Sequence, residues 1–170
     1  YQQAGTMALG GAFDRKGAGS LSFAVSGGTL RSTGHVSFPD VTSASFVAGS
    51  AMTLQVDEGC VLDLTPFTYG DNVTFTLTGS GDLILGNNLP ASLAVAAGGV
   101  FSPVGTRCNA FDITVASGGA IRFKSRGAEC RLITFEQGAA ATMDMNAFVS
   151  GDVVLVSESD ATLTAAAALL

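Results

Sequence analysis

The sequence has little of what catalytic and nucleic-acid-binding domains normally use. It contains no tryptophan and one histidine, His35, and only 13% of its 170 residues are charged, about half of the usual ~25%. Acidic residues outnumber basic ones by 14 to 8, which gives a net charge of −6. Nucleic-acid binding normally requires a basic patch or stripe. We therefore expect no nucleic-acid partner and no enzyme activity.

Several other features are missing. No run of 18 apolar residues occurs, so this segment is not expected to insert into a membrane. The three cysteines form no CxxC motif or Cys/His cluster, and no phosphate-binding loop motif is present, so we expect neither a metal nor a cofactor. The chain begins at Tyr1 without an initiator methionine or a leader. We therefore expect it to be a segment of a longer chain.

Glycine and apolar residues are abundant instead. The chain has 22 glycines, 47% hydrophobic residues and a mean hydropathy of +0.43, which argue for a folded core rather than disorder. Apolar residues and glycines recur in steps of 20. The columns are Val73, Leu93, Ile113, Ile133 and Val153; Phe75, Val95, Val115, Phe135 and Leu155; Gly98, Gly118 and Gly138; and Phe101, Ile121, Ala141 and Ala161.

Each repeat has the pattern of a short alternating strand, a glycine corner and a second alternating strand. This pattern predicts an all-β, single-stranded parallel β-helix (a β-solenoid), which we expect to be right-handed, with about 20 residues per coil. We expect one domain over 1–170, regular over 70–165 and less regular over 1–69. An antiparallel β-sandwich is the alternative, because it also has short strands with frequent turns.

The cysteines leave two alternatives open. A strict 20-residue register places Cys108 beside Ala128 and Cys130 beside Ala110, so the two cysteines are two residues out of register. That offset separates their Cα atoms by about 8 Å, beyond the ~7 Å limit for a disulfide. A loop or bulge near them would close the gap and allow a Cys108–Cys130 disulfide. Cys60 follows a glycine corner and is expected to be a small buried thiol.

Two further features are candidate sites. Asn72 begins an N-glycosylation sequon, Asn72-Val73-Thr74. Five of the eight basic residues gather in the C-terminal half, where a patch of them would bind an anionic glycan or an acidic face of a neighbouring subunit, or would simply aid solubility. These residues are Arg107, Arg122, Lys124, Arg126 and Arg131.

Three similar motifs follow alternating strands: SGGTL (26–30), AGGVF (97–101) and SGGAI (117–121). On these motifs the chain resembles the β-solenoid passengers and autotransporter-associated strand repeats of bacterial surface proteins. The resemblance implies an extracellular or cell-surface stalk, adhesin or filament component without catalysis. It carries over no site residues, because the shared motifs are structural.

We therefore expect a non-enzymatic extracellular structural protein that stacks end to end with its own copies or binds a host or surface glycan. One alternative is a carbohydrate-binding or polysaccharide-cleaving β-helix, which needs converging carboxylates. The other is a β-sandwich subunit of a capsid or pilus.

Overall fold

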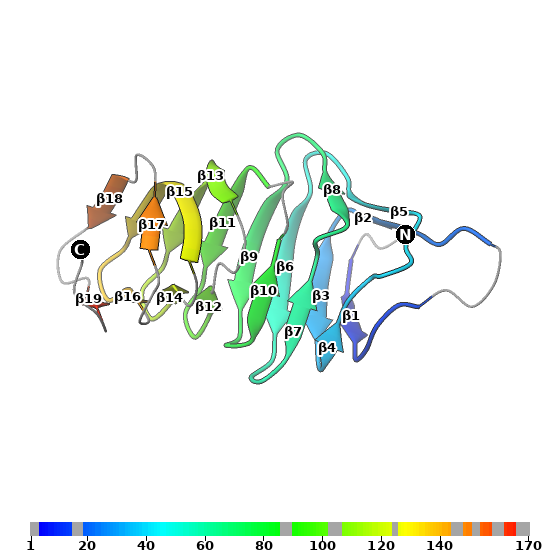
Figure 1. Ribbon diagram of the computed structural model, residues 1–170, viewed down its shortest axis with the longest axis horizontal. Helices are drawn as coiled ribbons and strands as arrows, with labels where there is room; N and C mark the ends of the chain where they lie inside the picture. The colour runs from blue at the N-terminus through cyan, green and yellow to red at the C-terminus, as the bar shows by residue number, and fades with distance from the viewer. Residues whose placement is uncertain are drawn as a thin grey trace.

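The computed structural model is an elongated stack of short strands that is broad at its N-terminal end and narrow at its C-terminal end (Figure 1). It describes residues 4–14, 19–85, 90–101, 107–123, 126–143, 148–150, 154–157 and 162–165. Every strand pairing in these residues is parallel. The β-solenoid is thereby confirmed, and the antiparallel sandwich is excluded because it requires antiparallel neighbours.

The strands form four sheets that run along the stack. The long sheet contains β1 (Thr6–Leu9), β3 (Gly28–Ser32), β6 (Ala51–Val56), β9 (Thr74–Thr78), β11 (Ser92–Val95), β13 (Arg107–Val115), β15 (Arg126–Phe135), β17 (Phe148–Ser150) and β18 (Val154–Ser157). The upper sheet contains β2 (Ser22–Val25), β5 (Ser43–Phe46) and β8 (Phe67–Tyr69). The lower sheet contains β4 (His35–Val36), β7 (Val61–Asp63) and β10 (Asp82–Ile84), and the tail sheet contains β12 (Val100–Phe101), β14 (Ala120–Phe123), β16 (Ala140–Met143) and β19 (Thr162–Ala165).

The cross-section changes along the stack. Each early coil contributes a strand to the long, upper and lower sheets, whereas the upper sheet ends at β8. In the residues that the structure describes, later coils contribute to the long sheet and to the tail sheet, which begins where β12 contacts β10 of the lower sheet. Figure 1 shows this narrowing. The coil becomes shorter where the upper sheet ends. Gly28 pairs with Met52, 24 residues later, but Thr74 pairs with Ser92, 18 residues later.

The repeat therefore averages about 21 residues rather than a strict 20. The predicted register holds over β11, β13 and β15, where Leu93, Ile113 and Ile133 are successive partners. It is wrong on both sides of this region. Leu93 pairs with Phe75 rather than Val73, and Ile133 pairs with Leu155 rather than Val153. Both corrections shift the pairing by two residues, which keeps every side chain on its predicted face because the side-chain period of a strand is two.

The true core columns run along the long sheet as far as β15, one from β1 and the other from β3. One column is Met7, Leu30, Leu54, Leu77, Val95, Val115 and Phe135, and the other is Gly28, Met52, Phe75, Leu93, Ile113 and Ile133. Most of these side chains are buried, and several have no exposed surface at all. Stacking apolar side chains in this way removes them from water along the whole axis.

Aromatic rings fill the wide, three-faced end. Phe13, Phe23 and Phe38 contact one another with centroids 5.1–5.2 Å apart, and Phe38 contacts Phe67 at 4.9 Å. Phe67 stacks on Phe46 at 4.8 Å. Contacting rings suit this end because three sheets enclose more space than two facing sheets, where the core is mostly Leu, Val, Ile and Ala with the single rings of Phe101 and Phe135.

The glycine corners are four-residue turns. Gly99 N donates to Ala96 O, and Gly119 N donates to Ala116 O. The third residue of each turn, Gly98 or Gly118, has a positive φ of 74° or 75°, which a type II turn requires. The second glycine is needed for space, because a Cβ on Gly119 would lie 2.5 Å from Val95 O. The paired glycines in AGGVF and SGGAI thus have separate roles. SGGTL differs, because it joins the upper sheet to the long sheet.

One ion pair links two neighbouring coils on the outer surface. The Arg31 guanidinium donates to both carboxylate oxygens of Asp57, with the shortest N–O distance at 2.7 Å, and Gln55 donates to the same carboxylate. Hydrogen bonding to Arg31 lowers the pKa of Asp57. The side chains are 42% and 27% exposed, so solvent screens the pair.

We expect Leu54→Ala to lower the free energy of unfolding by about 2–5 kcal/mol, because it leaves a cavity between Leu30 and Leu77 in a fully buried column. Urea denaturation followed by circular dichroism measures the change. Thr53→Ala, on the outer face of the same strand, is the control and should cost much less. Equal losses would contradict the assigned faces.

We expect the stabilisation from Asp57 to depend on pH. Because its pKa is lower in the folded state, the contribution is present above the unfolded pKa of ~3.9 and is lost as pH falls through the folded value. Asp57→Asn should therefore destabilise the protein more at neutral pH than below about pH 3. Urea denaturation at both pH values tests this, with the exposed Glu58→Gln as control. A pH-independent difference would count against the ion pair.

Candidate functional surfaces

The outward face of the long sheet carries a column of threonines. Partners in successive strands place one outward residue above the next, so the column is set by backbone pairing. Its members are Thr6, Thr29, Thr53, Thr76, Ala94, Thr114 and Thr134. Neighbouring strands lie about 4.8 Å apart, and threonine has few rotamers. The column therefore presents hydroxyl and methyl groups at a nearly regular spacing.

A shallow hollow lies on this threonine column. Its volume is about 360 Å³, and it spans β3, β6 and β9. The lining residues are Gly28, Thr29, Ala51, Met52, Thr53, Thr74 and Thr76. The small outward side chain of Ala51 leaves space, and threonine hydroxyls supply donors and acceptors around it. The hollow is an open, polar depression of the sheet surface rather than an enclosed cavity.

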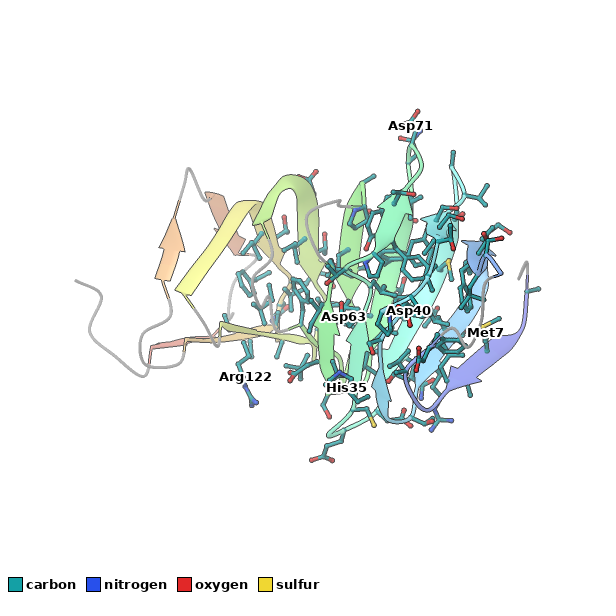
Figure 2. The ribbon with its side chains drawn as sticks, turned by 45° about the vertical axis from the view of Figure 1, so that its right-hand side comes forward. Met7, His35, Asp40, Asp63, Asp71 and Arg122 are labelled. Atoms are coloured by element: carbon teal, nitrogen blue, oxygen red, sulfur yellow. The ribbon has the colours of Figure 1, made fainter. Side chains whose placement is uncertain are left out.

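Ionisable side chains in the described part of the chain meet in pairs, as at Arg31–Asp57 and Asp14–Asp40. Figure 2 shows Asp71 on a loop at the opposite side of the molecule from His35 and Arg122. No group of three His, Cys, Asp or Glu with the arrangement of a metal site occurs in these residues. His35 lies at the exposed start of β4, as a surface histidine would.

One pair of carboxyl groups does meet. Asp14 hydrogen-bonds Asp40, and this contact together with the repulsion between their charges raises the pKa of Asp14. Both residues are exposed. Direct contact brings the carboxyl groups closer than the ~5 Å or more that glycoside hydrolysis requires. The pair therefore lacks the geometry for polysaccharide cleavage by that mechanism.

The four predicted patch residues that the structure describes lie on two different sheets. Arg122 is exposed on β14 of the tail sheet, whereas Arg107, Arg126 and Arg131 belong to β13 and β15 of the long sheet. Arg107 and Glu129 are backbone partners in the adjacent strands β13 and β15. Lys124 lies outside the described residues. A shared anion-binding patch remains a prediction.

Asn72 lies on an exposed turn and has a positive φ of 59°, which asparagine tolerates better than most residues. Val73 is fully buried, and Thr74 begins β9. The sequon asparagine is thus accessible to solvent, and its glycosylation remains a prediction.

The cysteines are closer in register than predicted. Cys108 pairs directly with Cys130, whereas Asp112 pairs with Leu132. The expected two-residue offset is therefore wrong at the cysteines. A register shift between Cys108 and Asp112 absorbs the two extra residues. Cys60 is a free thiol of intermediate exposure rather than a fully buried one.

The broad end of the stack presents terminal strands. Among the described residues, β1, β2 and β4 each pair with a strand on one side only. Met7, Phe13 and Phe23 are only partly buried against the core at this end. Figure 2 shows Met7 on the outermost strand of the long sheet.

Two of these features escaped sequence analysis. The threonine column was visible only at Thr114 and Thr134, because coil length varies among the early coils and a fixed step misses the earlier members. The Asp14–Asp40 contact joins residues from two different coils, and no local pattern indicates it.

In the part of the chain that the structure describes, no helix is long and apolar enough to cross a membrane. Comparison of the chain with protein-family models, with curated proteins and with solved structures finds no match.

Proposed function

We propose that this chain is a non-enzymatic structural β-solenoid of a secreted or cell-surface protein, similar to an autotransporter passenger, that acts as a stalk, adhesin or filament component. The observation that carries the proposal is the unbroken parallel pairing of successive coils in the long sheet over two continuous apolar columns. This architecture supplies length and rigidity, which are the properties that such components need.

The direction of the hydrogen bonds supports this role. Backbone hydrogen bonds between coils run along the stack, as in Thr74 N to Ser50 O at 2.9 Å and Ala116 N to Val95 O at 2.9 Å. Extending the stack requires breaking a complete set of these bonds and exposing a layer of apolar side chains. The fold therefore resists separation of its coils.

End-to-end association follows from the same pairing. In β1, the carbonyls of Gly5 and Leu9 accept bonds from Thr29 and Thr33 of the next coil. Because backbone groups alternate along a strand, the N–H groups of Thr6 and Ala8 point away from that coil. Among the described strands none pairs with these groups, and we propose that a coil of a second copy pairs there and covers Met7.

The test is self-association. We expect the purified chain to form linear assemblies in sedimentation velocity and electron microscopy as its concentration rises. Ala8→Pro removes an outward N–H without removing a bond to β3 and should abolish the assemblies. Ala8→Ser keeps the N–H and is the matched control. A wild-type chain that stays monomeric at high concentration would refute end-to-end stacking.

The hollow on the long sheet favours a second candidate function, binding of a neutral glycan. Its threonine hydroxyls match the hydrogen-bonding groups of a sugar ring. The rings of Phe46, Phe67 and Phe75 are buried in the core, so they offer a glycan no aromatic platform and hydroxyl contacts would dominate.

Glycan-array screening followed by calorimetry with any glycan that binds tests this second function. Thr53→Val replaces the central hydroxyl by a methyl group of similar size and should weaken binding roughly three- to tenfold, the worth of one hydrogen bond. Thr114→Val, in the same column but outside the hollow, should leave affinity unchanged. No binding on the array, or equal loss in both variants, would eliminate this function.

A further inference from the structure

We propose that Cys108 and Cys130 form a disulfide that staples two neighbouring coils of the long sheet. This disulfide is supported by the backbone pairing of the two strands that contain the cysteines. Cys108 in β13 and Cys130 in β15 are direct Cα partners in adjacent parallel strands. Adjacent strands lie about 4.8 Å apart, and disulfide-bonded cysteines usually have Cα atoms about 4.4–6.8 Å apart. The two positions therefore meet the Cα-distance requirement for a disulfide.

A break in the regular pairing creates this juxtaposition. Asp112 pairs with Leu132 at the 20-residue step, but Cys108 pairs with Cys130 at a 22-residue step, and the shift falls between Cys108 and Asp112. With the 20-residue step continued, Cys108 would lie opposite Ala128. The bulge thus places Cys108 directly opposite Cys130, whereas a regular register would leave the two Cα atoms too far apart for a disulfide.

The third cysteine is too distant to compete. Cys60 lies in the turn that joins β6 to β7, and the long sheet places β9 and β11 between β6 and β13. Three strand spacings amount to about 14 Å, twice the ~7 Å that a disulfide tolerates. Of the three disulfides that three cysteines could form, the fold therefore favours Cys108–Cys130.

Formation of the bond requires an oxidant. Each thiol gives up one proton and one electron, a bond forms between the two sulfur atoms, and a disulfide such as glutathione disulfide is reduced to two thiols by exchange. The secreted location in the proposed function places the chain in an oxidising environment. The inference rests on the proposed function only for this source of oxidant. An experiment in a defined glutathione buffer separates the two proposals.

The experiment is a thiol map of the full wild-type chain. The folded protein is equilibrated with reduced and oxidised glutathione, its free thiols are alkylated, and tryptic peptides are identified by mass spectrometry. Cleavage after the basic residues separates Cys108 (peptide 108–122), Cys130 (127–131) and Cys60 (32–107). We expect 108–122 joined to 127–131, with alkylation on Cys60 alone.

Thermal unfolding provides a second readout. Oxidation should raise the melting temperature by about 5–10 °C, because the bond closes a loop of some 20 residues in the unfolded chain. The rise should persist in Cys60→Ser and vanish in the double variant Cys108→Ser/Cys130→Ser. Alkylation of all three cysteines after equilibration, or linkage of peptide 32–107 to either partner, would overturn the proposal. Neither result would bear on end-to-end stacking.

Discussion

Backbone pairing between one coil and the next is the constraint on which the rest of this structure depends. In a parallel ladder the partner of a residue lies directly above it and faces the same way. An inward residue therefore stacks on an inward residue of the next coil, and an outward residue stacks on an outward one. Leu30, Leu54 and Leu77 follow this rule inside the long sheet, as Thr29, Thr53 and Thr76 follow it outside.

The same rule explains how the fold tolerates coils of unequal length. Residues are added or removed in the corners and loops, where loss of the upper sheet shortens the coil. Within a sheet, a register change by two residues keeps each side chain on its face. The shift beside Cys108 is of this kind, and the steps of 18 and 22 residues at Phe75 and Leu155 likewise differ by two from the predicted 20. Variation along the stack is thus compatible with one continuous core.

In the function we propose, contacts are made by repeating surfaces of the stack rather than by residues of a cleft. Described carboxylates are scattered, apart from the exposed Asp14–Asp40 contact. The features that do recur are the threonine column, the open strands at the broad end and the paired positions of Cys108 and Cys130. Each follows from stacking coils, and each suits a component whose role depends on length, cohesion and surface contact.

The sequence by itself determined the fold class, the faces of the strands and the glycine corners. These are local properties: alternation over a few residues marks a strand with one buried face, and a type II turn demands glycine. Only the tertiary structure decided which residues are partners, as with Leu93 on Phe75 and Cys108 on Cys130. Pairing depends on the number of residues in each corner and loop. That number depends on whether the coil has strands in two sheets or in three. The number of sheets is a property of neighbouring coils rather than of any one repeat.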